Sequence, residues 1–337
     1  MRTVILDQPG SFRLAETPEP ARPGPGEALI EVKRVGVCGT DLHAFAGRQP
    51  FFTYPRILGH ELGAVVVETG PDVASPRAGD RVAVEPYLAC GHCVACRAGR
   101  YNCCATLRVL GVHVDGGMRE RLVVPARLLH RSDRLSLEQL ALVETLGIGA
   151  HAVERSALQP SEWAVVVGVG PIGIGVLQMT LARQARVIAV DLSAARLAFA
   201  AALGATATVN AREQDVAAAI ADLTDGDMAA CVFDATGSPA SMERSVQLPG
   251  NGGRLVCVGL TQARLSFDNP SFHRRELTIL ASRNSNNAFP GLIRLLEEGA
   301  VDVTPWITHR LPLEAVPDRF ADLTAPGSGT VKALVVL

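Results

Sequence analysis

Five of the eight cysteines of this chain gather in one short segment, residues 90–104. Three of them are separated by two residues each, and a fourth thiol follows at either of two adjacent positions: Cys90, Cys93, Cys96, and then Cys103 or Cys104. Four thiolates complete a tetrahedral shell without an open position, which is the arrangement of a structural zinc site. His92 lies between two of these ligands, and we expect its side chain to face away.

A second set of candidate ligands is dispersed along the first half of the chain: Cys38, His60, Glu61 and Glu144. One thiolate, one imidazole and one or two carboxylates suit zinc. Because so few fixed ligands leave a coordination position open, this composition is typical of a catalytic rather than a structural metal. The ordinary alternative is that His60 and Glu61 are structural residues without a metal.

A glycine-rich turn follows a predicted buried strand, and its six residues are Gly168, Val169, Gly170, Pro171, Ile172 and Gly173. The first glycine permits the tight turn, the second lets a pyrophosphate approach the backbone, and the third lets helix and strand pack closely. The N-terminus of the next helix would then offer free N–H groups to the phosphates. This context predicts a dinucleotide site.

Asp191 ends the next predicted strand, about 20 residues beyond Gly168, where a carboxylate bonds the ribose hydroxyls of NAD. A 2′-phosphate would be repelled there, so the sequence favours NAD over NADP. Two alternatives stay open: Asp191 could cap the following helix, and the neighbouring Arg196 could soften the preference.

The elements that must position these residues follow two different patterns of predicted secondary structure. Residues 1–150 contain short runs of strand type, such as 28–32, 63–68 and 81–84, separated by turns rich in Pro and Gly, which predicts a barrel-like β domain. Residues 137–156 are rich in Ala and Leu and predict a helix. From Trp163, strands alternate with helices, which predicts βαβ units and a parallel sheet. A last strand, 330–337, breaks that alternation and is expected to return to the first domain.

Composition narrows the class of protein. The 337 residues favour two domains, and 48% of them are hydrophobic, enough for two buried cores. Lys and Arg number 32 against 34 Asp and Glu, which gives no electrostatic case for nucleic acid or an anionic membrane. No apolar run approaches the ~20 residues of a spanning helix, and the N-terminal one is too short for a signal peptide. We therefore expect a soluble, cytoplasmic protein.

Together these motifs resemble the zinc-containing medium-chain alcohol dehydrogenases over essentially the whole chain. The matching segments are Cys-Gly-Thr-Asp-Leu-His at 38–43, Gly-His-Glu at 59–61, Gly-Asp-Arg-Val at 79–82, the cysteine loop and the glycine turn. The run at 144–151 resembles the sorbitol and threonine dehydrogenase branch, which has a Glu at its start. The family's spacing of its last two ligand cysteines also matches Cys96 and Cys104.

The resemblance implies a fold and a division of the chain. It implies a GroES-like β-barrel catalytic domain (residues 1–150), a Rossmann doubly wound parallel sheet that binds NAD (151–285), and a return to the catalytic domain (286–337). It also implies two zinc ions per chain and a homotetramer or homodimer. Cys38 and His60 would bind the catalytic zinc, Glu61 and Glu144 would be exchangeable or water-linked ligands, and Asp41 would hold the imidazole of His60.

Further roles follow from the same resemblance. Thr40 would bond the substrate oxygen and pass its proton towards His43; the ordinary alternatives are a turn hydroxyl for Thr40 and a surface histidine for His43. A set of loop residues would shape the cofactor pocket: Thr236, Val258, Gly259 and Arg283. Lys332 would reach a cofactor phosphate.

The implied reaction is hydride transfer to NAD from a secondary alcohol of a polyol or sugar derivative. An aromatic group could wall the substrate pocket or simply pack: Phe45, Phe51, Phe52 and Tyr54. The cationic tract 272–284 resembles relatives that act on sugar acids, which keeps a gulonate- or galactonate-type or a threonine-type substrate as the alternative; its cations could equally face a subunit interface or solvent. A non-enzymatic relative would usually lack Cys38, His60 and Glu61, and a zinc-ribbon interaction protein would lack the nucleotide turn.

Overall fold

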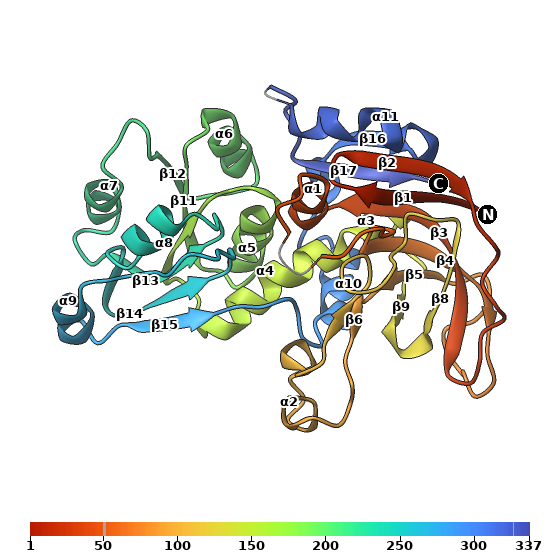
Figure 1. Ribbon diagram of the computed structural model, residues 1–337. Coiled ribbons are helices and arrows are strands. Elements are labelled where there is room, and N and C mark those ends of the chain that lie inside the picture. Colours follow the sequence, from red (N-terminus) through yellow and green to blue (C-terminus); the bar gives the residue numbers. More distant parts are fainter. Residues whose placement is uncertain (50–51, 326) are drawn as a thin grey trace. The chain divides into compact units, whose positions relative to one another are not determined.

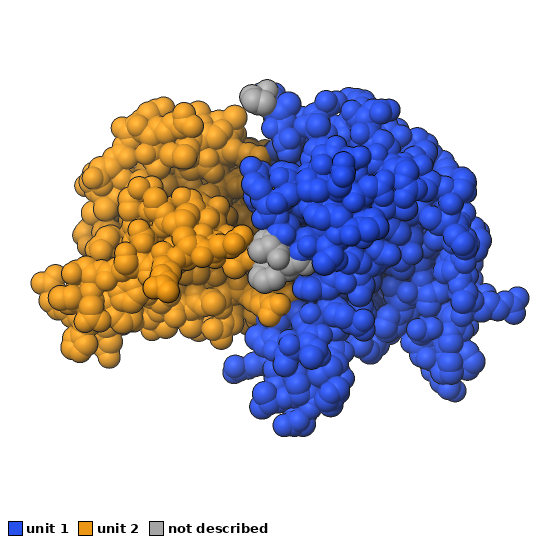
Figure 2. Space-filling model, in the orientation of Figure 1, with its two compact units in different colours: residues 1–145, 289–337 blue, residues 146–288 orange. Residues whose placement is uncertain are grey.

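The computed structural model describes residues 1–49, 52–325 and 327–337 (Figure 1). The chain divides into two compact units (Figure 2), unit 1 with residues 1–145 and 289–337 and unit 2 with residues 146–288. Along the sequence, unit 2 is therefore one continuous stretch inserted between the two segments of unit 1. Within the described residues, none of the helices combines the length and the apolar composition that crossing a bilayer requires.

Unit 1 is built mainly from β-strands. They are β1 (Arg2–Gln8), β2 (Ser11–Glu16), β3 (Glu27–Val37), β4 (Glu61–Thr69), β5 (Arg81–Val84), β6 (Tyr87–Leu88), β7 (Arg108–Val109), β8 (Arg121–Pro125), β9 (Leu129–Arg131), β16 (Ile307–Pro312) and β17 (Lys332–Val336). A seven-stranded sheet has the order β16-β17-β3-β4-β5-β9, with β8 also paired to β3. Only the β16–β17 pair is parallel in this sheet. The long strand β3 is its centre, because it pairs with three other strands.

The helices of unit 1 are short. They are α1 (Gly39–Phe45), α2 (Val94–Arg97), α3 (Leu137–Ala141), α10 (Phe289–Glu297), α11 (Val316–Arg319) and the 3₁₀ turns η1 (Tyr101–Cys103), η2 (Ala126–Leu128), η3 (Thr304–Trp306), η4 (Leu313–Ala315) and η5 (Phe320–Thr324). Helix α4 (Val143–Ser156) begins in unit 1 and continues into unit 2. The helix predicted over 137–156 is thus two helices, which meet at Leu142. Ser136 caps the first one with a reciprocal bond to Gln139.

Unit 2 is a six-stranded parallel sheet with connecting helices (Figure 1). Its strands are β10 (Trp163–Val167), β11 (Arg186–Asp191), β12 (Ala207–Asn210), β13 (Ala229–Asp234), β14 (Pro249–Cys257) and β15 (Thr278–Ala281), and its helices are α5 (Pro171–Ala182), α6 (Ala194–Ala202), α7 (Val216–Leu223), α8 (Pro239–Ser245) and α9 (Asn269–Arg274). The order β12-β11-β10-β13-β14-β15 reverses direction between β10 and β13. Such a reversal opens a crevice at the carboxyl ends of the strands, where doubly wound sheets bind ligands.

Candidate functional site

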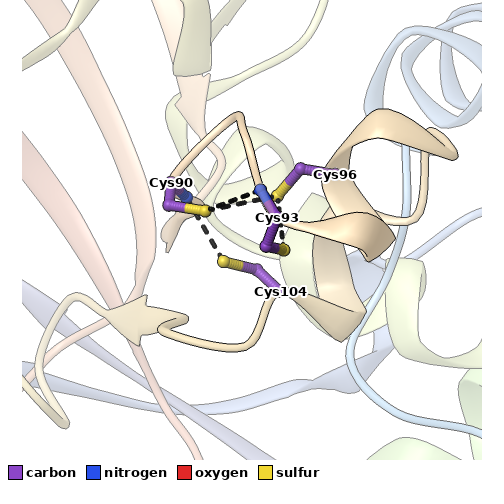
Figure 3. Close-up of side chains that lie close together, drawn as sticks. All are labelled: Cys90, Cys93, Cys96 and Cys104. Atoms are coloured by element: carbon purple, nitrogen blue, oxygen red, sulfur yellow. Dashed lines mark hydrogen bonds between the residues drawn. The ribbon is translucent and has the colours of Figure 1, made fainter.

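Four cysteines of the segment 90–104 point their sulfur atoms at one another (Figure 3). The sulfurs of Cys90, Cys93, Cys96 and Cys104 all lie within 4.8 Å of each other, and the Cys93–Cys96 pair is 3.5 Å apart. Zinc–sulfur bonds of ~2.3 Å in a tetrahedron place ligand sulfurs roughly 3.8 Å apart. The group therefore has the size of a four-thiolate zinc shell. Cys103 is exposed and outside it.

Backbone N–H groups around this loop stabilise thiolates. Cys90 N donates to Cys104 Sγ (3.3 Å), and Cys93 N donates to Cys90 Sγ (3.4 Å). The backbone N–H groups of Ala105 and Cys96 lower the pKa of Cys93 to about 6, whereas burial raises the pKa of Cys96 to about 12. Zinc binds thiolates, so its binding would displace the proton that Cys96 keeps. The exposed ring of His92 meets the Cys90 carbonyl oxygen and not the thiols.

A second group of potential ligands lies where α1 and β4 begin. Cys38 caps the N-terminus of α1, His60 directly precedes β4, and Glu61 is its first residue. Their ligand atoms lie within 4.8 Å of one another, and His60 and Glu61 are buried. One thiolate, one imidazole and one carboxylate at this separation fit a zinc ion with a coordination position left over.

Two buried polar atoms beside this group have no hydrogen-bond partner, namely His60 Nδ1 and Asp41 Oδ1, which are 3.7 Å apart. Burial raises the pKa of Asp41. Burial acts to lower the pKa of His60, but the charges of Asp41, Cys38 and Glu144 outweigh it and hold that pKa well above its usual value. Unpaired polar atoms are rare in protein interiors. The site is thus suited to a bound cation, with Asp41 facing the imidazole as a metal-bound histidine requires.

Lys332 belongs to this group and not to a cofactor phosphate site, which corrects the prediction made for it. Its Nζ is 2.6 and 2.7 Å from the two carboxylate oxygens of Glu61 and 3.3 Å from the Val37 carbonyl oxygen. An ammonium group has three donors, so all are used, and the side chain is only 1% exposed. Burial acts to lower the pKa of Lys332, but Glu61, Cys38 and Glu144 raise it, so the ammonium stays charged.

The strand register explains how Lys332 reaches Glu61. Gly36 of β3 lies opposite Glu61 of β4 on one side, and the β17 segment that begins at Lys332 pairs on the other side, with Ala333 opposite Val37. A Cβ atom at Gly36 would come within 1.9 Å of Glu61 Oε2. The missing side chain of Gly36 therefore makes the space in which the carboxylate sits.

Glu144 lies near the start of α4 and is 5% exposed. It is not one of the three clustered ligands, but its charge acts on His60. Burial raises the pKa of Glu144, opposed by the charge of His60. The hydroxyl of Tyr87 donates to Glu144 Oε1. Sequence reasoning missed Tyr87, because nothing in a lone tyrosine predicts a partner 57 residues away.

The predicted proton path lies on α1, where Thr40 is half-buried and His43 is exposed. The aromatic residues weighed as pocket walls mainly pack: Phe45 stacks on Phe12 at 5.4 Å and meets Phe320 at 5.2 Å, and the rings of Phe52 and Tyr54 are 5.1 Å apart. Phe51, the remaining candidate, lies outside the described residues.

The glycine turn of unit 2 has the backbone that its sequence predicts. Gly168 has φ +83°, and a Cβ atom at Gly173 would come within 1.9 Å of the Gly168 carbonyl oxygen. Gly170 caps α5, whose first two residues are Pro171 and Ile172. Asp191 accepts Val169 N (2.8 Å) and Ser193 N (2.9 Å), so this carboxylate also fixes the turn.

The other predicted cofactor residues follow the ends of parallel strands. Thr236 comes after β13, where its N–H and hydroxyl donate to the buried Asp234 (2.9 and 2.6 Å). The N–H groups of Val258 and Gly259 donate to the Asp234 carbonyl oxygen, both at 2.9 Å. Arg283 follows β15 and is exposed.

Two basic residues of unit 2 have defined surroundings. Arg196 lies in the first turn of α6, where burial lowers its pKa and Asp191 opposes this effect. In the cationic tract 272–284, the guanidinium group of Arg275 donates to the carbonyl oxygens of Val246, Gln247 and Pro249. Arg275 thus holds the chain where β14 begins.

Known proteins resemble this chain in sequence and in fold. Residues 24–134 match the alcohol dehydrogenase GroES-like domain family, and residues 171–298 match the zinc-binding dehydrogenase family. The chain is 40% identical to L-galactonate-5-dehydrogenase of Escherichia coli K12 (95% of this chain, 94% of that one) and 33% identical to sorbitol dehydrogenase of Bacillus subtilis 168 (94% and 92%). It is also similar to a crystal structure from E. coli CFT073, described as a short chain alcohol dehydrogenase (rspB) complexed with cofactor NADH, with a TM-score of 0.94, 30% identity and 100% and 99% coverage.

These matches confirm the resemblance drawn from the motifs, and with it the GroES-like and Rossmann architecture. They cover the segments that hold both cysteine-containing groups and most of the parallel sheet. The chain belongs to the zinc-type alcohol dehydrogenase family and is an oxidoreductase.

Proposed function

We propose that the chain oxidises a secondary alcohol of a polyol with NAD, using one zinc at Cys38, His60 and a carboxylate, and a second zinc at the four clustered cysteines. The single observation that carries the proposal is the group formed by the half-buried Cys38 and the buried His60 and Glu61, whose ligand atoms lie within 4.8 Å of one another. The charge of Glu144 also acts on His60. A carboxylate-rich shell distinguishes this site from the closed shell of thiolates.

Zinc at this site supplies the Lewis acidity that lowers the pKa of an alcohol, and the nicotinamide ring supplies the acceptor of the hydride. The residues of the chain bind the metal, orient its ligand and move the proton. Cys38 and His60 hold the metal, and Asp41 orients the imidazole of His60. Thr40 binds the substrate hydroxyl and passes its proton to the exposed His43, from which it leaves to solvent.

Unit 2 supports NAD as the dinucleotide. The N-terminus of α5 faces the pyrophosphate in this proposal, and Asp191 receives the ribose hydroxyls. A 2′-phosphate would meet the negative charge of Asp191, although Arg196 nearby reduces that repulsion. Thr236, Val258, Gly259 and Arg283 line the same edge of the sheet, and we propose them as cofactor contacts.

A sugar acid is the second candidate substrate. The observation in its favour is the 40% identity to a dehydrogenase of L-galactonate, against 33% to one of sorbitol. We further propose a homotetramer or homodimer, which light scattering on the purified protein would decide, and a reducing compartment, the cytoplasm, because zinc sites need free thiols.

The test is a panel of polyols, sugar acids, amino alcohols and short alcohols with NAD and with NADP, followed by absorbance of the reduced cofactor and accompanied by metal analysis. We expect two zinc ions per chain and turnover of a polyol or sugar acid with NAD. Cys38→Ser should lose turnover and one zinc, whereas the matched control Cys103→Ser, at the exposed cysteine, should lose neither. Unchanged turnover in Cys38→Ser would refute the proposed role of the metal.

A further inference from the structure

The side chain of Tyr87 connects the four-cysteine loop with the surroundings of Cys38, His60 and Glu61, which we call the catalytic group. Tyr87 lies in β6, and its ring is 3% exposed. It packs in a small separate core, which we call the cysteine lobe core: Tyr87, Cys96, Cys104, Leu107, Val109 and Val112. This aromatic ring therefore rests directly on the residues that surround the four-thiolate site.

The hydroxyl of the same residue leaves that core and donates to Glu144 Oε1. A carboxylate with one oxygen engaged by a buried donor is fixed in orientation. The charge of Glu144 raises the pKa of His60, so the place at which Tyr87 holds this carboxylate bears on the group that would bind the catalytic metal. Residues that hydrogen-bond to the side chains around a metal affect its affinity and activity nearly as much as the ligands themselves do.

A second contact joins the lobe to the catalytic group through the backbone. The chain leaving the lobe packs on Gly59, the residue before His60: a Cβ atom at Gly111 would come within 2.8 Å of Gly59 N, and one at Gly116 within 2.3 Å of Gly59 O. Gly117 N donates to Gly59 O at 2.9 Å. Any change in the shape of the lobe therefore bears on the residues beside His60 as well as on Glu144.

We propose that Tyr87 is a positioning residue that couples the two metal sites, so that occupancy of the four-cysteine site sets the orientation of Glu144 at the catalytic site. The metal held by the cysteines fixes the lobe, the lobe fixes the ring of Tyr87, and its hydroxyl fixes the carboxylate. This inference rests on the proposed function, since it requires a metal at Cys38 and His60.

The first experiment replaces zinc by Co²⁺ and records the absorption spectrum and the dissociation constant of the catalytic site, identified as the signal absent from Cys38→Ser. Tyr87→Phe keeps the packed ring and removes only the hydroxyl. We expect a changed catalytic-site spectrum and affinity weaker on the order of 10-fold. Tyr101→Phe, at a 40% exposed tyrosine of the same loop, is the matched control and should leave both unchanged. A wild-type spectrum and affinity in Tyr87→Phe would overturn the proposal.

The second experiment tests the coupling itself by a double-mutant cycle. Cys104→Ser, which opens the four-cysteine site, should alter the catalytic Co²⁺ spectrum clearly more in the wild-type background than in the Tyr87→Phe background, where only the backbone contact at Gly59 is left to transmit the change. Equal effects in both backgrounds would show that Tyr87 does not carry the coupling. If Cys104→Ser does not fold, removal of the metal from the four-cysteine site alone takes the place of that substitution. The cycle then compares wild type with Tyr87→Phe, each with and without this metal. Absence of any Cys38-dependent cobalt signal in wild type would instead refute the proposed function.

Discussion

Replacing Lys332 by Met tests the most deeply buried ion pair of unit 1. The substitution keeps the length of the side chain and removes the charge that faces both oxygens of Glu61, a residue with 0% exposure. Removing one partner of a buried pair costs about 3–5 kcal/mol, since the other charge is left without compensation. We expect this loss in the free energy of unfolding of unit 1 in the metal-depleted protein. It should be smaller with zinc bound, because the cation replaces the ammonium as the partner of Glu61.

The two tryptophans make the assay specific, since Trp306 lies in unit 1 and Trp163 in unit 2. In a Trp163→Phe background, urea unfolding followed by Trp306 fluorescence reports on unit 1. Lys33→Met is the matched control: it breaks the partly exposed pair with Glu31 and should cost at most about 1 kcal/mol.

A double variant separates the charge from the packing. Glu61→Leu combined with Lys332→Met should recover most of the lost stability, because apolar replacements of a buried pair are often neutral. The reasoning fails if Lys332→Met costs no more than Lys33→Met, or if the double variant is as unstable as the single one.

Three further predictions concern other parts of the chain. Gly173→Ala should destabilise unit 2 by about 1–3 kcal/mol through overpacking, whereas Gly170→Ala, with open space around the added Cβ, should spare stability and weaken NADH binding in a fluorescence titration. Asp191→Asn should raise the kcat/KM ratio of NADP to NAD by about 10-fold, since it removes a charged acceptor; an unchanged ratio contradicts the assignment. The bonds from Arg310 lower the pKa of Glu138, so Glu138→Gln should cost about 0.2–1 kcal/mol at neutral pH, and thermal unfolding should show the difference vanish as pH falls through that lowered pKa.

The fold class followed from local patterns, because strands such as β10 and β11 are continuous apolar runs followed by helical periods. Shorter or more polar elements carried no such signal. Strand β12 has only four residues, with one of them buried, and was not predicted. The single helix expected over 137–156 is interrupted at Leu142 without a Pro or Gly to mark the break.

The candidate site was predictable where its residues are close in sequence. The spacing of the cysteines placed three ligands on one loop, and the family spacing separated Cys104 from Cys103. Partners distant in sequence were beyond such reasoning. Lys332 meets Glu61 across 271 residues, through a register of three strands and the missing side chain of Gly36. The family resemblance had placed Lys332 at a cofactor phosphate, whereas its ammonium group is bonded to Glu61 and Val37.

The ion pair of Lys332 and Glu61 also bears on the order in which the protein folds during synthesis. During synthesis all of unit 2 emerges before Lys332, so its parallel sheet can fold while the sheet of unit 1 still lacks β17. Until that strand arrives, the carboxylate of Glu61 has no ammonium beside it. A metal ion present at that moment would find the carboxylate free to bind. Whether a metal ion or β17 arrives first therefore decides which cation first neutralises Glu61.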